Sequence, residues 1–171
     1  MRVLVSYFSQ TGNTEKVAQA IHEEASRTEE SELKKIGEVD LGSLDDYDIV
    51  FVGSPTHVGD LSAAVKEFLA KMPKSPRFKV AGFVTHAGYE PEDFHMCVPS
   101  FANAAKAKRI VLCGCFDCRG RLAPPIRPVV KENKGVSDEQ WERDMQELDA
   151  HPNAEDERTA REFARSMLAE A

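Results

Sequence analysis

The residues with the clearest chemistry lie in one short turn near the start of the chain. Three hydroxyl groups and an asparagine amide surround a glycine there, in the order Ser9-Gln10-Thr11-Gly12-Asn13-Thr14. A helix that begins at such a turn adds unpaired backbone N–H groups and the positive end of its dipole, which together suit a phosphate. No lysine or arginine lies between Phe8 and Lys16, so these donors are neutral. The alternative is a helix cap made by threonine and asparagine side chains.

The spacing of this turn differs from two common phosphate-binding motifs. It matches neither the Walker A pattern nor the G-x-G-x-x-G pattern, which disfavours P-loop NTPases and Rossmann dinucleotide folds. The turn follows the apolar run Val3–Phe8, which reads as a strand. Ligands of open α/β sheets bind at the carboxyl ends of the strands, so the position of the turn favours a ligand site.

The elements around the turn alternate between short apolar runs and amphipathic stretches, a pattern typical of α/β proteins with a parallel sheet. Strands are expected at Val3–Phe8, Leu33–Ile36, Asp48–Gly53, Lys79–Thr85 and Arg109–Cys115. Helices are expected at about Asn13–Ser26, from a cap at Asp60 to Pro73, over residues 93–107, and from Ala154 behind a cap at Asn153. The pattern predicts a doubly wound α/β sheet in a single domain spanning residues 1–171.

Residues 116–153 form an extended segment that this minimal pattern does not need. They contain Pro124, Pro125 and Pro128, and then a short helix candidate that opens at Ser137, with Gln140 in the position of a capping box. Connections of this length usually form a lid, an interface or a flexible loop. Three apolar residues can dock the helix on the body: Trp141, Met145 and Leu148. Five basic residues suit an acidic partner, the phosphate of a second nucleotide or a solvated surface: Arg119, Arg121, Arg127, Lys131 and Lys134.

The turn resembles the FMN phosphate loop of the flavodoxin family, commonly written as Ser or Thr, any residue, then Thr-Gly-x-Thr. Residues 53–60 and 85–89 fall where that family keeps the loops that flank its flavin. The resemblance covers residues 1–115 in register and the last helix. It implies FMN as the cofactor and a three-layer, five-stranded parallel sheet of order 2-1-3-4-5.

The resemblance also implies which residues bind the cofactor, with one loop on each side of the flavin ring. They are Ser9, Gln10, Thr11, Gly12, Asn13, Thr14, Pro55, Thr56, His57, Val58, Gly59, Thr85, His86, Ala87, Gly88 and Tyr89. Tyr89 is expected either to stack on the ring or to be a surface tyrosine beside a turn. The family's usual aromatic residue in the first loop is absent, since His57 and Val58 stand there.

Redox roles are implied for one glycine and two histidines of these loops. In flavodoxins a glycine peptide reorients so that its carbonyl accepts a hydrogen bond from the one-electron-reduced flavin, and Val58-Gly59-Asp60 is similar to that segment. Histidine titrates near neutrality, so His57 or His86 can couple electron uptake to proton uptake. The alternative is that both histidines only hydrogen-bond to backbone.

Three cysteines form a C-x-C-x-x-C pattern, Cys113, Cys115 and Cys118, with Cys97 in another segment. Zinc and iron–sulfur sites usually need a fourth ligand, and strand alternation would aim Cys113 and Cys115 at the same face of a sheet. Packing in the core is therefore favoured over a metal site or redox chemistry at Cys118.

The composition of the chain limits the classes of partner that it can bind. The chain has 171 residues and a net charge of −7, which argues against nonspecific binding to nucleic acid. The charge is uneven, because residues 61–136 are basic and the segments on either side are acidic. No apolar run approaches the ~20 residues that span a bilayer. We expect a cytoplasmic protein with reduced thiols, and no nucleic-acid or membrane partner.

Three functions fit this sequence. The first is a low-potential electron carrier that cycles FMN through quinone, semiquinone and hydroquinone states between a reductase and an acceptor protein. The second is an NAD(P)H-dependent quinone or flavin reductase on the same fold, and the third is a module that senses a nucleotide without redox chemistry. No nucleophile–base pair or pyridine-nucleotide motif is recognisable, which favours the carrier, as a monomer or a weak homo-oligomer.

Overall fold

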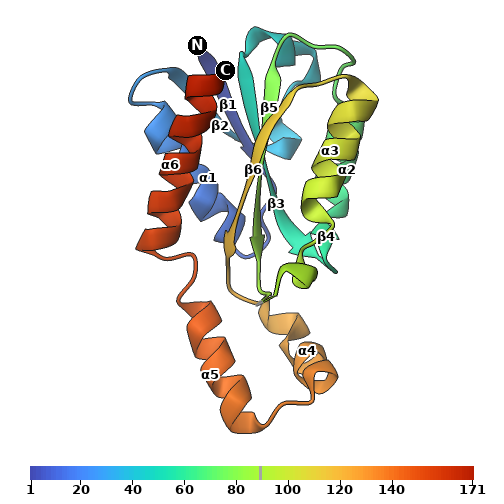
Figure 1. Cartoon of the computed structure of the whole chain (residues 1–171), viewed down its shortest axis with the longest axis vertical. Coiled ribbons are helices and arrows are strands. Elements are labelled where there is room, and N and C mark those ends of the chain that lie inside the picture. Colours follow the sequence, from blue (N-terminus) through green and yellow to red (C-terminus); the bar gives the residue numbers. More distant parts are fainter. Residues whose placement is uncertain (89) are drawn as a thin grey trace.

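A parallel β-sheet forms the centre of the computed structural model, which describes residues 1–88 and 90–171 (Figure 1). The strands run in the order β2-β1-β3-β5-β6. Their bounds are β1 Arg2–Tyr7, β2 Glu30–Lys35, β3 Ile49–His57, β5 Lys79–His86 and β6 Leu112–Arg119. This confirms the predicted five parallel strands and their order. A short strand that was not predicted, β4 (Asp60–Leu61), pairs antiparallel with the end of β3.

Helices cover both faces of the sheet and give the predicted three layers (Figure 1). The helix bounds are α1 Asn13–Ala25, α2 Ala63–Lys71, α3 Cys97–Lys108, α4 Arg127–Lys134, α5 Asp138–Asp149 and α6 Ala154–Glu170. Short 3-10 helices lie at Ile36–Glu38, Leu41–Asp46, Pro91–Asp93 and Pro124–Ile126. Helices α1 and α6 pack on one face, and α2 and α3 pack on the other. No helix in the described part of the chain is long and apolar enough to cross a membrane.

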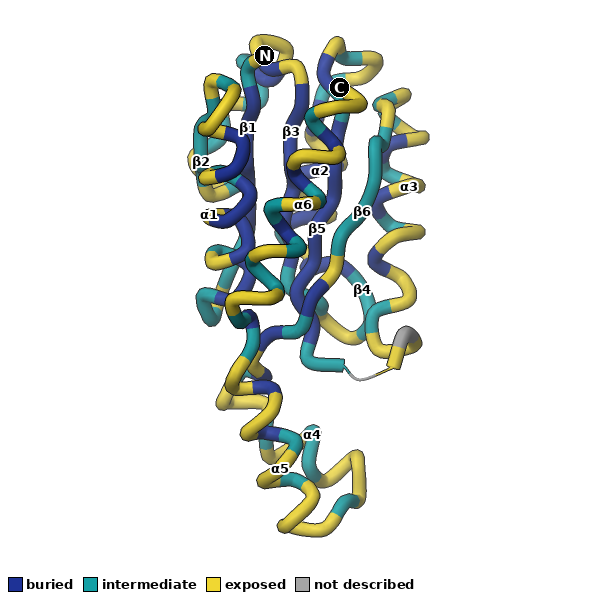
Figure 2. Tube along the Cα trace, turned by 60° about the vertical axis from the view of Figure 1, so that its left-hand side comes forward, coloured by how far each residue is buried: buried dark blue, intermediate teal, exposed yellow. Residues whose placement is uncertain are grey.

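The apolar runs of the central strands supply two cores, one on each face of the sheet. Phe51 and Phe83 are fully buried with α1 and α6, whereas Val50 and Val52 are fully buried with α2 and α3. Because alternate side chains of one strand enter opposite cores, a central strand must be apolar throughout. Figure 2 shows β1, β3 and β5 as the most deeply buried part of the molecule.

Several predicted boundaries are wrong, for identifiable reasons. Helix α2 is capped by Ser62, whose Oγ accepts from the Val65 N–H, whereas Asp60 lies in β4. Helix α3 begins at Cys97, because residues 91–93 form a separate 3-10 turn. Strand β2 begins at Glu30, and its first three residues were missed because they are polar and give no apolar signal at this edge of the sheet.

A bulge in β6 overturns the expected placement of the cysteines. The register with β5 jumps from Val80↔Leu112 to Ala81↔Gly114, so Cys113 has no partner of its own. The extra residue reverses the alternation that follows it. Cys113 therefore packs with the α1 and α6 core, while Cys115 packs with the α2 and α3 core. Strand β6 also continues to Arg119, beyond the predicted end at Cys115.

The extended segment folds into an arm, which we define as residues 120–153 and which contains α4 and α5. It projects from the carboxyl edge of the sheet, at the end opposite both chain termini (Figure 1, Figure 2). Helix α5 was predicted, and Ser137 Oγ accepts from the Gln140 N–H at 3.2 Å as its cap. Helix α4 was not predicted, because prolines occupy its beginning.

A small apolar cluster and three ion pairs to α5 stabilise the arm. Leu122, Met145 and Leu148 are buried together, with Trp141 partly buried against them, as predicted for the docking residues of α5. Three residues of the predicted basic stretch form ion pairs with acidic residues of α5: Arg119 with Glu147, Arg127 with Asp149 and Lys131 with Asp138. These pairs hold the basic part of the segment against acidic α5.

The cap of α6 gives a test of how the last helix is fixed. The Asn153 side chain accepts from the backbone N–H groups of Glu155 and Asp156 at 2.9 and 3.1 Å, as the sequence predicted. We expect Asn153→Ala to lower the free energy of unfolding in urea by about 1 kcal/mol. Asn103→Ala, at an exposed position of α3, is the control and should change it by less than about 0.5 kcal/mol. Equal effects of the two substitutions would contradict the role of the cap.

Candidate functional site

The predicted phosphate turn lies between β1 and α1, at the carboxyl edge of the sheet. Gly12 stands at the N-cap with φ +85°, and no side chain caps the helix. Ser9 Oγ instead accepts from the Gly12 N–H at 3.1 Å, which tightens the turn. The first N–H groups of α1 therefore keep their hydrogen-bonding capacity for another acceptor. The alternative of a helix capped by Thr or Asn side chains is not what the described structure shows.

Asn13 and Thr14 fix the turn to the strands beside it. Both side chains are buried, and Thr14 Oγ1 lies 2.9 Å from Thr85 Oγ1 at the end of β5. Asn13 Nδ2 donates to the Arg121 carbonyl oxygen at 2.8 Å, in the segment that follows β6. The turn thus joins residues from three distant parts of the chain.

The first predicted ring loop is a tight hairpin between β3 and β4. Its tip, Val58-Gly59, has positive φ at both residues (51° and 78°), which are the signs of a type I′ turn. Val58 is fully exposed there, although a β-branched residue is strained in this region. The Gly59 carbonyl accepts from the Met96 N–H at 3.1 Å. His57 Nε2 lies 2.9 Å from Gln10 Oε1 and so links this hairpin to the phosphate turn.

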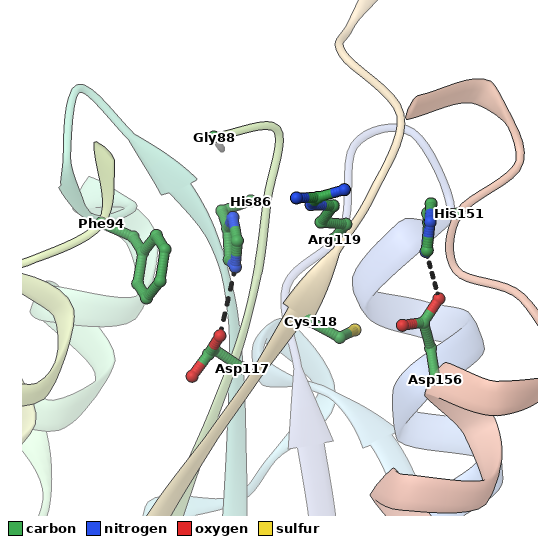
Figure 3. A pocket seen from close by; sticks show the side chains of 8 residues that line it. All are labelled: His86, Gly88, Phe94, Asp117, Cys118, Arg119, His151 and Asp156. Carbon is green, nitrogen blue, oxygen red and sulfur yellow. Dashed lines mark hydrogen bonds and ion pairs between the residues drawn. The ribbon is translucent and has the colours of Figure 1, made fainter. Parts of the chain in front are cut away.

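The second predicted ring loop begins at buried residues of β5. The His86 ring stacks on Phe94 with a centroid separation of 3.8 Å, and its Nε2 lies 3.2 Å from Asp117 Oδ2 (Figure 3). His86 Nδ1 is buried and has no hydrogen-bond partner within the described residues. Ala87 and Gly88 follow at intermediate exposure. The prediction for Tyr89 lies outside the described residues.

The structure brings most of the predicted residues to one edge. Residues 9–14, 55–59 and 85–88 lie at or just beyond the carboxyl ends of β1, β3 and β5, which are adjacent strands of the sheet. Both histidines use side-chain partners, Gln10 and Asp117, and not the backbone partners of the alternative interpretation. Pro55 and Thr56 still belong to β3, with Thr56 Oγ1 3.5 Å from the thiol of Cys97.

A pocket of about 350 Å³ lies beside His86, and sequence reasoning missed several of its residues. It is lined by His86, Gly88, Phe94, Asp117, Cys118, Arg119, His151 and Asp156 (Figure 3). His151 Nδ1 lies 2.6 Å from Asp156 Oδ2, at the beginning of α6. These residues come from four separate segments with no common motif, so only the fold could reveal them.

The cysteines are packing residues in this structure. Burial raises the pKa of the Cys118 thiol far above its ordinary value, and it raises the pKa of Cys115 to about 11. Within residues 1–88 and 90–171, no group of three or more potential ligands is placed to hold a metal ion. A protonated thiol is a poor nucleophile, and the burial of Cys118 in the α1 and α6 core agrees with the prediction of ordinary packing.

The donor set of the turn fits a phosphate monoester. The uncapped N–H groups of α1 and the hydroxyls of Ser9 and Thr11 belong to one short turn. Gly12 has nothing within 4 Å of the position of an added Cβ, so the space over the turn is open. Neutral N–H groups at a helix N-terminus are sufficient to bind a phosphate oxygen.

Comparisons with known proteins agree with this geometry. A family model described as a flavodoxin domain matches residues 4–165. The chain is 29% identical over 178 residues to the flavodoxin-like domain-containing protein BilS of Clostridioides difficile, which covers 100% of this chain and 98% of that protein. A flavodoxin of Picosynechococcus is 43% identical over 56 residues, covering 32% of this chain and 33% of the flavodoxin.

Solved structures show the same fold. The crystal structure of flavodoxin 2 from Bacillus cereus aligns with a TM-score of 0.69 and 20% identity. The alignment covers 100% of each chain. At this identity the likeness concerns the fold alone.

The raised thiol pKa values predict slow alkylation in the folded protein. With a pKa of about 11, native Cys115 should react with iodoacetamide at pH 8 roughly 100-fold more slowly than in urea. Its rate should rise about tenfold for each pH unit between pH 8 and 10, whereas the unfolded thiol levels off. Mass spectrometry of the labelled peptides gives both rates. Equal rates in the folded and unfolded protein would indicate a reactive thiolate.

Proposed function

This chain belongs to the flavodoxin family, and from that premise we propose that it binds FMN at the carboxyl edge of its sheet and carries electrons at low potential. The observation that carries the proposal is the uncapped N-terminus of α1 in an open, neutral turn. FMN supplies the one-electron chemistry when bound, and the protein supplies binding, orientation and electrostatics.

The phosphate end of the cofactor is assigned to the turn of residues 9–14. Backbone N–H groups at the start of α1 would donate to the phosphate oxygens, together with the hydroxyls of Ser9 and Thr11. Thr14 has a different role, because its hydroxyl is paired with that of Thr85. The buried pair keeps the turn in register with β5, where the second ring loop begins.

The flavin ring is assigned to the two loops beyond this turn. Pro55, Thr56, His57, Val58 and Gly59 would lie on one side, and Thr85, His86, Ala87 and Gly88 on the other. The exposed hairpin tip at Val58 leaves this edge of the molecule reachable from solvent, as electron exchange between proteins requires. His86 Nδ1, which lacks a partner in the described structure, is the atom we assign to proton uptake near the ring.

The proposed partners are a reductase that supplies electrons and an acceptor protein that takes them. The chain carries both signs of charge in separate blocks, so partner docking does not follow from its net charge of −7. We propose that the protein works as a monomer or a weak homo-oligomer in the cytoplasm, where its four free cysteines would stay reduced.

A second candidate is an NAD(P)H-dependent quinone or flavin reductase. The observation that favours it is the pocket of about 350 Å³ beside His86, which is bordered by Arg119 at the base of the arm. A reductase needs such a space for a second substrate near the flavin.

Cofactor titration tests the proposal and separates the two candidates. We expect the purified protein to bind FMN with quenching of flavin fluorescence, and to accept electrons from dithionite in two resolved one-electron steps. The carrier should oxidise NADPH slowly with a quinone unless a separate reductase is added. Rapid oxidation without that reductase would support the second candidate, and failure to bind FMN would contradict both.

Gly59→Ala tests the role of the first ring loop. The alanine is strained at φ +78°, and it restricts reorientation of the peptide whose carbonyl now accepts from Met96. We expect the separation between the two one-electron reduction potentials to shrink, as measured by potentiometric titration. Gly37→Ala, where an added Cβ contacts nothing within 4 Å, is the control and should leave the separation unchanged. An unchanged separation in Gly59→Ala would exclude this peptide from tuning the potential.

A further inference from the structure

We propose that Arg121 is a ligand of the cofactor phosphate, brought to the neutral turn by the segment that follows β6. The proposal rests on FMN binding as the function, and it assigns the turn a positive charge that its own residues lack. The argument depends on how the turn, the segment and the guanidinium are held.

Lys16, the lysine nearest to the turn in the sequence, already interacts with residues at the beginning of α6. Lys16 Nζ donates to the Pro152 carbonyl oxygen at 2.7 Å and pairs with Glu157 at 3.1 Å, so its charge is directed at the beginning of α6. No other cation lies between Phe8 and Lys16 in the sequence. A phosphate on this turn would therefore meet only neutral donors from residues 9–14.

The segment after β6 is built against the turn. The Gly120 N–H donates to the His86 carbonyl oxygen at 2.8 Å, which fixes the segment to the end of β5. The Asn13 side chain donates to the Arg121 carbonyl oxygen at 2.8 Å. A Cβ on residue 120 would lie 2.8 Å from the Asn13 amide, so this close approach requires glycine. Arg121 is therefore held beside the turn through its backbone.

The guanidinium of Arg121 lies along the turn itself. Its Nη2 donates to the Thr11 carbonyl oxygen at 3.2 Å, and its Nε donates to Asn13 Oδ1 at 3.4 Å. These bonds use two of its five N–H groups. Thr11 and Arg121 line the same pocket of about 510 Å³, so Arg121 borders the space beside the turn.

The charge of Arg121 is not neutralised, in contrast to its basic neighbours. Arg119, Arg127 and Lys131 each form an ion pair with an acidic residue of α5. Arg127, which lines the same pocket as Arg121, is also fixed to the Leu122 carbonyl oxygen at 3.0 Å. Arg121 has no carboxylate within ion-pair distance among the described residues. Arg121 is thus directed at the turn, whereas Arg119, Arg127 and Lys131 are directed at α5.

A guanidinium in this position favours a phosphorylated flavin over an unphosphorylated one. Arginine can give a phosphate two parallel, charge-assisted hydrogen bonds, which are about twice as strong as neutral ones. Loss of such a contact should weaken binding of FMN by about 10- to 100-fold and leave binding of riboflavin unchanged.

The test compares FMN with riboflavin in three proteins: the wild type, Arg121→Gln and Arg143→Gln. Arg143 lies on α5 and hydrogen-bonds to Gln140, so its substitution removes the same charge away from the turn. Dissociation constants come from quenching of flavin fluorescence at fixed salt. We expect Arg121→Gln to bind FMN more weakly and riboflavin as tightly as the wild type does. Arg143→Gln should bind both flavins with unchanged affinity. An equal loss for both flavins, or no loss, would overturn the proposal.

A second measurement uses the wild-type protein, so it does not depend on whether a variant folds. Phenylglyoxal modifies exposed arginines, and peptide mass spectrometry reports the rate at each site. We expect saturating FMN to protect Arg121, and riboflavin to leave its modification rate unchanged. Equal rates with FMN and with riboflavin would overturn the role of Arg121 while FMN binding itself stands. A wild-type protein that binds neither flavin would instead overturn the proposed function and this inference together.

Discussion

The start of α1 must present its backbone N–H groups to an outside acceptor, and the rest of the site is arranged around this requirement. An uncapped helix end is costly if it is also buried without partners, so the turn stays open above Gly12. The supporting contacts lie behind it, where Thr14 meets Thr85 and Asn13 meets the segment after β6. Buried polar pairs of this kind hold the turn without occupying its donors.

The sequence predicted the parts of this arrangement that depend on local pattern. Apolar runs located β1, β3 and β5, and the spacing of residues 9–14 located the turn that joins β1 to α1. The cap at Asn153 followed from the same kind of local signal. These features are determined by neighbouring residues along the chain, so one sequence is sufficient to find them.

The features that the sequence did not predict depend on contacts between distant segments. The bulge at Cys113 is set by the register of β6 against β5, and no local sequence pattern around Cys113 predicted it. The stacking of His86 on Phe94 and the position of Arg121 beside Thr11 arise only once the strands are adjacent. The cap at Ser62 was missed because Asp60 is an equally favourable N-cap type, and its pairing in the short strand β4 depends on a contact with β3.

The bulge in β6 has a consequence for the sheet as a whole. Strands β2 and β6 are its two edges, and an edge strand offers free N–H and C=O groups to any other extended chain. At β6 the bulge interrupts the regular spacing of those groups, while β2 carries two lysines and two glutamates in its six residues. Neither edge is therefore a regular, apolar template, which disfavours edge-to-edge growth of the sheet into aggregates.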